Sequence, residues 1–131
     1  MDHENMDVYN VALEFVTFVR ELLKRMRGGR WGLDSQLMRA ATSMPLNIAE
    51  GGGEFSPKDK ARFYRIARRS ATECAAALDV CVRLLLVSED DVRPGRDLLR
   101  RVVSMLTKLV LGHEAAGQRS VSVIQRDPTA L

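Results

Sequence analysis

A stripe of basic side chains runs along one face of a predicted helix in the middle of the chain. Its members are spaced four, three and four residues apart, which keeps them on one helical face over about 16 Å. They are Lys58, Arg62, Arg65 and Arg69. Lys60 and Arg68 lie at the sides of this basic stripe, and Phe63 and Tyr64 lie between its members. Cations repeated at this spacing can follow several phosphates, so the predicted chemistry is contact with a nucleic-acid backbone.

The uneven distribution of charge supports this interpretation but leaves an alternative open. Residues 56–88 contain seven basic and three acidic side chains, whereas the whole chain has a formal net charge of only +3. The alternative is that the arginines form salt bridges with acidic residues of the last helix or of a neighbouring subunit, or simply solvate a surface. Base-specific recognition is not predicted, because the sequence has no helix-turn-helix spacing, zinc knuckle or aromatic sheet platform.

Other residue types that could do chemistry do not form a recognisable site. Cys74 and Cys81 are seven residues apart, about 10.5 Å of helical rise, too far to form a disulfide within one helix. We interpret them as small buried residues in a reduced compartment. His3 and His113 lie far apart without partners at ligand spacing, and GGGE at 51–54 follows a helix rather than a strand. We therefore expect no enzyme, no metal site and no cofactor.

The elements that carry these residues are all predicted to be helices of one domain. Apolar residues make up 46% of the 131-residue chain and aromatic residues only 5%, a composition typical of packed helices. Apolar side chains recur every three or four residues in four segments. These segments span residues 8–26, 34–50 and 56–85, and a last one that starts between 89 and 95 and runs to about 113. The prediction is an all-α, up-and-down antiparallel four-helix bundle over residues 1–116, with a loose C-terminal tail over 117–131.

The second helix contains a proline and ends in three glycines. Pro45 removes one backbone donor and costs about 3 kcal/mol inside a regular helix, so a kink or a break is expected there. The hydroxyls of Thr42 and Ser43 are candidates to satisfy the freed carbonyls. The glycines at 51–53 are expected to release the chain into a flexible connection.

A polar strip follows the proline in an otherwise small and apolar segment. Ser43, Asn47 and Glu50 are spaced four and three residues apart, so they share one helical face. We interpret Asn47 and Glu50 as hydrogen-bonding to backbone opened by Pro45 or to a neighbouring chain, since no nucleophile or second acid accompanies them.

The segment RAATSMPLNIAEGGGEFSPKDKARFYRIARRSATECAAALDV resembles the signature region of the 23S rRNA intervening-sequence protein family. The shared pattern is S-x-P-x-N-I-A-E-G, followed by a basic, aromatic-containing helix start. Here it is formed by Ser43, Pro45, Asn47, Ile48, Ala49, Glu50 and Gly51. The resemblance covers most of residues 5–113 and implies a non-enzymatic four-helix bundle that assembles into a ring-like homopentamer. It also implies a distant kinship to the accessory variability protein of diversity-generating retroelements, which works with a reverse transcriptase and nucleic acid.

Two functions follow as expectations. The first is a non-enzymatic oligomeric bundle that binds RNA or DNA backbone through the basic stripe, with contacts multiplied around a ring. The alternative is a protein scaffold or adaptor, because wide apolar helix faces often mark interfaces. The first residues lack a secretory signal, and no apolar run reaches the roughly 20 residues needed to span a bilayer. We therefore expect a cytoplasmic protein without a membrane anchor.

Overall fold

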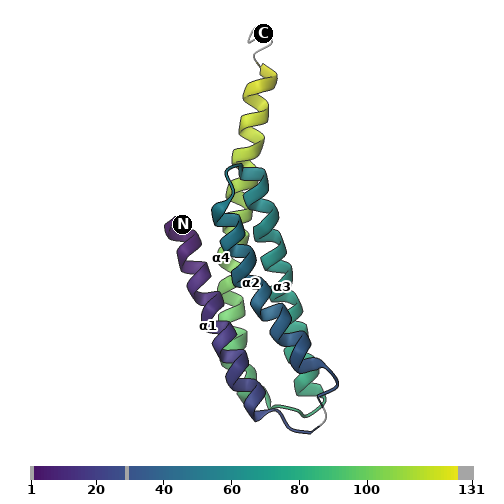
Figure 1. Cartoon of the computed structure of the whole chain (residues 1–131). Coiled ribbons are helices and arrows are strands. Elements are labelled where there is room, and N and C mark those ends of the chain that lie inside the picture. Colours follow the sequence, from purple (N-terminus) through teal and green to yellow (C-terminus); the bar gives the residue numbers. More distant parts are fainter. Residues whose placement is uncertain (1, 29, 127–131) are drawn as a thin grey trace.

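The described part of the chain contains four helices that run alternately up and down (Figure 1). The computed structural model describes residues 2–28 and 30–126, the last seven by their backbone alone. The helices are α1 (His3–Arg25), α2 (Leu33–Gly53), α3 (Pro57–Arg83) and α4 (Glu89–Arg126). The prediction of an all-α, four-helix bundle is confirmed.

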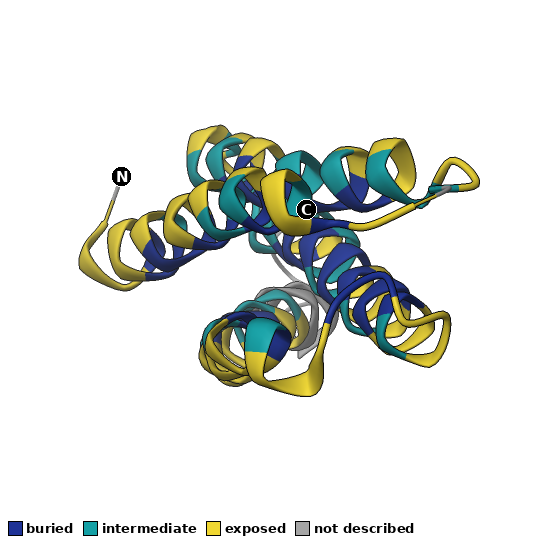
Figure 2. Cartoon of the chain, turned by 90° about the horizontal axis from the view of Figure 1, so that it is seen from below, coloured by how far each residue is buried: buried dark blue, intermediate teal, exposed yellow. Residues whose placement is uncertain are grey.

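Each helix packs against two of the others. α2 contacts α1 and α3, and α4 contacts α3 and α1, whereas the described residues of the diagonal pairs α1 and α3, and α2 and α4, are not backbone neighbours. Viewed along the bundle, the buried side of each helix faces the interior and the exposed side faces out (Figure 2). This arrangement places the outer face of α3 next to α4 on one side and α2 on the other.

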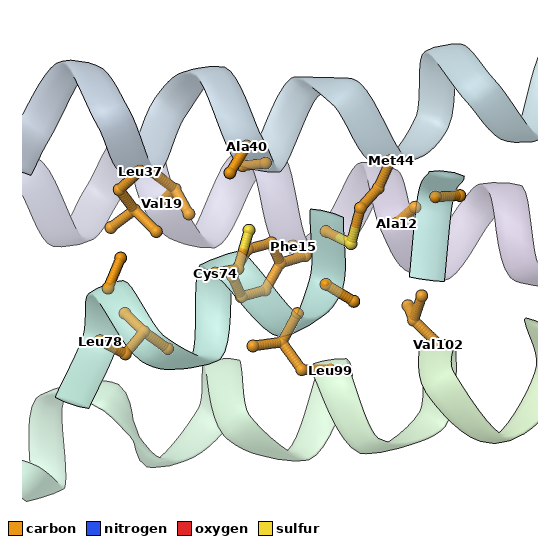
Figure 3. Close-up of a cluster of buried hydrophobic side chains, with 14 of the residues drawn as sticks. Ala12, Phe15, Val19, Leu37, Ala40, Met44, Cys74, Leu78, Leu99 and Val102 are labelled. Atoms are coloured by element: carbon orange, nitrogen blue, oxygen red, sulfur yellow. The ribbon is translucent and has the colours of Figure 1, made fainter. Parts of the chain in front are cut away.

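The core is built from apolar side chains of all four helices at the predicted three- and four-residue spacing. Phe15, Leu37 and Leu78 are completely buried in it. The cluster drawn in Figure 3 also includes Ala12, Val19, Ala40, Met44, Cys74, Leu99 and Val102. Burying a side chain of the size of leucine or phenylalanine contributes about 1.5–3 kcal/mol, so this interior is the main source of stability.

Three helices begin at side-chain caps. Asp2 accepts a hydrogen bond from the Asn5 backbone N–H at 2.9 Å, which starts α1 at His3, five residues before the predicted boundary. Ser56 accepts from the Asp59 backbone N–H at 3.1 Å, and α3 starts with Pro57 as predicted. Ser88 and Asp91 cap α4 reciprocally, with N···O distances of 2.9 and 3.0 Å. α4 therefore starts at Glu89, within the predicted interval, and runs on through Pro94.

The predicted end of the second helix was wrong. α2 continues through Pro45 and ends at Gly53, so Pro45 does not break it, and the kink stays a prediction. The glycines at 51–53 form the last helical turn rather than a flexible connection. Two of them are there because neighbouring side chains come very close: a Cβ on Gly51 would lie 2.6 Å from Cε1 of Tyr64, and one on Gly52 would lie 3.0 Å from Nδ2 of Asn5.

The predicted start of a loose tail at Gly117 was also wrong. α4 remains helical to Arg126 and extends past the ends of the other helices (Figure 1). A single glycine inside a helix costs only about 1 kcal/mol, which is too little to end a helix that is well anchored upstream. The rest of the predicted tail, residues 127–131, lies outside the described residues.

Candidate nucleic-acid interface

The six predicted binding residues all lie on α3, but they divide into two groups. Lys58, Arg62 and Arg69 are exposed, whereas Lys60, Arg65 and Arg68 are half-buried. The structure keeps the first three together on the outer face of the helix. The other three reach sideways to the neighbouring helices.

The half-buried members have structural partners. Arg65 Nη1 lies 3.3 Å from Glu114 Oε1 on α4, and Arg68 Nη1 donates to the Thr107 hydroxyl at 3.4 Å. Lys60 Nζ donates to the carbonyl oxygens of Gly51 and Gly52 at 3.2 and 3.4 Å. The lysine thus binds carbonyls at the C-terminal end of α2 and complements the negative end of its dipole. The Gly51 carbonyl also accepts from the Glu54 backbone N–H at 3.3 Å.

The exposed members have no carboxylate partner among the described residues. Arg62 packs over the neighbouring ring of Phe63, with 4.6 Å between the guanidinium carbon and the ring centroid. Within the described part of the chain, the alternative of salt bridges to the last helix is therefore realised at Arg65 but not at Lys58, Arg62 or Arg69. Tyr64, predicted to lie within the stripe, is completely buried and contributes nothing to this surface.

A hollow of about 460 Å³ opens beside the stripe, between α3 and α4. Its α3 side is formed by Lys58, Ala61 and Arg65, and its α4 side by His113, Glu114, Gly117 and Gln118. Pockets that bind small ligands have volumes of roughly 300–1,000 Å³. Spacing along the chain does not reveal this hollow, because the hollow depends on how α4 lies against α3.

His113 is held against the core by Tyr64. The two ring centroids lie 5.6 Å apart, with the rings tilted by 31°. Burial and the positive charge of Lys60 lower the pKa of His113 from 6.5, whereas Asp2 and Glu4 oppose the shift. Its imidazole is therefore mainly uncharged near neutral pH.

A polar layer inside the bundle joins α1 to α2 and α3. Asn5 is completely buried, and its Nδ2 donates to the Ile48 carbonyl at 3.0 Å and to the Tyr64 hydroxyl at 2.7 Å. Burial raises the pKa of Tyr64, so this hydroxyl stays protonated. Asn5 was not among the predicted site residues, although it lies seven residues before Ala12 and so continues the apolar stripe of α1.

The polar strip of α2 has a different role from the predicted one. Asn47 Nδ2 donates to the Ser43 carbonyl at 2.8 Å and to the Ser43 hydroxyl at 3.0 Å. Ser70 of α3 also donates to this hydroxyl, at 2.8 Å, so the strip joins two helices. Thr42 bonds to the carbonyls of residues 38 and 39, not to the Ala41 carbonyl that Pro45 frees.

Glu50 does not take part in this polar contact. Its side chain is exposed and has no hydrogen-bond or ion-pair partner among the described residues. Its predicted bond to backbone opened by Pro45 is therefore wrong. A bond to a neighbouring chain stays a prediction.

The cysteines and histidines do not combine into a metal centre. Cys74 and Cys81 are buried free thiols, and burial raises the pKa of Cys74 to about 12. Burial also raises the pKa of Cys81. Among the described residues, no three His, Cys, Asp or Glu side chains lie close enough to hold an ion. The same residues include no helix long and apolar enough to cross a membrane.

These features define an up-and-down four-helix bundle with a polar layer at one end of its core and a cationic outer face on α3. The family model of the 23S rRNA-intervening sequence protein matches residues 4–108. The chain therefore belongs to this family. No curated protein matches the chain. The matched region includes the whole S-x-P-x-N-I-A-E-G motif and all six basic residues of the candidate interface.

Proposed function

We propose that the protein is a non-enzymatic, homo-oligomeric bundle that binds the phosphate backbone of RNA or DNA through the outer face of α3. The observation that carries this proposal is the exposure of Lys58, Arg62 and Arg69 without carboxylate partners among the described residues. A surface cation without an ion-pair partner loses no existing salt bridge when it binds a phosphate. Its binding also releases counterions from the nucleic acid. Arg65, Arg68 and Lys60 act mainly by holding α3 against its neighbours.

The oligomer is part of the same proposal. The family resemblance implies a ring-like homopentamer, in which each subunit would present the same three cations. Several weak sites presented together raise the apparent affinity without any new contact. The proposal also includes a cytoplasmic location, where nucleic acid and a partner such as a reverse transcriptase are accessible.

A charge-reversal pair tests this function. Arg62→Glu combined with Arg69→Glu should abolish binding of labelled RNA and DNA at low salt while leaving oligomer size and helical content unchanged. The matched control is Arg101→Glu combined with Lys108→Glu, since these two exposed cations of α4 are also seven residues apart. Binding by the unchanged protein should weaken as salt rises, because each phosphate contact contributes about −0.7 to −0.9 to the logarithmic salt slope.

A scaffold or adaptor is the second candidate. Phe55 is 98% exposed and Leu46 is 65% exposed, and both lie in or beside the motif segment. Exposed apolar side chains of this size often belong to a protein interface. Under this function, neither charge-reversal pair would change partner binding, whereas Phe55→Ser would weaken it.

A further inference from the structure

The hollow between α3 and α4 has one exposed cation of α3, Lys58, on one side and the imidazole of His113 on the other. Lys58 belongs both to the basic stripe and to the wall of the hollow. Arg65, seven residues after Lys58 in α3, also lines the hollow, and His113 lines it from α4. A chain of phosphates that follows α3 therefore passes the mouth of a space of about 460 Å³.

We propose that this hollow accepts one unstacked base of a single-stranded nucleic acid. This inference rests on the function proposed above and makes it more specific. Bases of a duplex are stacked and paired, so only a single strand, a loop or an end can place a base there. The bound class would accordingly be single-stranded RNA or DNA rather than a regular duplex.

The walls suit the flat, apolar face of a base. The half-buried imidazole of His113 provides an uncharged lining, and histidine is one of the side chains on which unpaired bases stack. Gly117 leaves the wall open, because a Cβ built there would meet nothing within 4 Å. Tyr64 packs against His113 from inside the bundle and fixes the position of the ring.

The polar groups suit the edge of a base and its phosphate. The amide of Gln118 can both donate and accept, and the carboxylate of Glu114 can accept from an exocyclic amino group. Glu114 is paired with Arg65 at 3.3 Å, which reduces its repulsion of a nearby phosphate. Lys58 is exposed, has no ion-pair partner among the described residues, and can hold that phosphate.

The first part of the test compares three fluorescent probes with the full-length protein. They are a single strand of mixed sequence, a strand of the same length in which every base is replaced by an abasic site, and the corresponding duplex. All three probes carry backbone phosphates. Phosphate contacts alone would therefore give the intact strand and the abasic strand equal affinity. We expect the intact strand to bind about tenfold more tightly than the abasic strand, because stacking of one base on a side chain is worth about this factor.

The second part fills the hollow without harming the fold. Gly117→Leu places a large side chain in the open wall and also improves helix propensity. Gly112→Leu is the matched control, because Gly112 lies on α4 outside the hollow and a Cβ there also meets nothing within 4 Å. The Gly117 variant should lose the preference for intact over abasic strand but keep the residual binding of the abasic strand. The control should keep both.

The outcomes separate the two proposals. Equal affinity for intact and abasic strands, or a full preference in Gly117→Leu, would overturn the base site. Backbone binding would still stand if it depended on Arg62 and Arg69. If none of the probes bound at low salt, both proposals would be overturned.

Discussion

The Nδ2 atom of Asn5 lies 2.7 Å from the hydroxyl oxygen of Tyr64, and this bond crosses the bundle between two helices that are not neighbours. The same nitrogen also donates to the Ile48 carbonyl, so one amide joins α1 to both α2 and α3. The Oδ1 atom of Asn5 is buried without a partner among the described residues. The layer is therefore held together by the two hydrogens of a single side chain.

Replacing Asn5 with alanine should destabilise the bundle by about 2–3 kcal/mol. The variant leaves the buried Tyr64 hydroxyl without the Asn5 donor and removes the bond from α1 to the Ile48 carbonyl. An unsatisfied buried group costs about 1–3 kcal/mol. Urea unfolding monitored by circular dichroism measures the loss. Asn10→Ala is the control, because Asn10 is exposed on α1 and should change the free energy of unfolding by less than about 0.5 kcal/mol. A similar, small effect of both substitutions would show that the layer does not stabilise the fold.

Two glycines of the motif segment should respond to alanine with opposite sign. Gly51→Ala places a Cβ 2.6 Å from Cε1 of Tyr64, and overpacking of this kind typically costs about 1–3 kcal/mol. Gly53→Ala meets nothing within 4 Å, so it should stabilise α2 by up to about 1 kcal/mol through helix propensity.

Thermal or urea unfolding of these two variants and of the unchanged protein compares their free energies of unfolding. Tyr64→Leu should cost less stability in the Gly51→Ala background than in the unchanged protein, because the ring edge is the obstacle to the new Cβ. Stabilisation by Gly51→Ala would mean that the close approach of α2 and α3 is not required.

The sequence predicted the helices well because their apolar spacing is set by the same period that the backbone follows. Boundaries were harder to predict. The glycines at 51–53 resemble a local helix end. The small size of Gly51 and Gly52, however, allows contacts with Tyr64 and Asn5, which are distant in the chain. Gly117 likewise resembled a stop signal, although one glycine cannot end a long helix.

The candidate site was predictable only as a list of cations. Spacing placed Lys58, Arg62, Arg65 and Arg69 on one face, and that much follows from helical geometry. Which of them stay free depends on what α4 and α2 present opposite each one. Glu114 lies 49 residues after Arg65, and no local pattern relates the two. The hollow beside these cations likewise depends on how α4 packs against α3, which no local pattern predicts.

Gly95 should be intolerant of a side chain because of Phe18. A Cβ at Gly95 would lie 2.1 Å from Cε1 of that ring, so α4 and α1 could not keep their present separation. Gly95→Ala should cost about 1–3 kcal/mol despite the better helix propensity of alanine. Phe18→Leu shortens the opposing side chain, and the double variant should be less destabilised than the sum of the two single variants. Strict additivity in urea unfolding would contradict the contact.

The stability of the bundle should fall as the solution is acidified below pH 6.5, and His113 should account for part of the loss. Burial and the positive charge of Lys60 lower the pKa of His113 from 6.5. Between the pKa of the folded state and 6.5, the unfolded chain therefore binds a proton that the folded chain does not. Under these conditions the free energy of unfolding decreases as pH decreases.

The measurement is urea unfolding of the unchanged protein and of His113→Gln at about pH 7.5 and about pH 5.5. Glutamine does not titrate, so the variant should lose less stability between the two pH values. Every other titratable side chain is the same in both proteins, so its contribution cancels in the difference between them. An identical loss in both would mean that His113 is equally easy to protonate in the folded and unfolded states, and that its ring is not enclosed between α3 and α4.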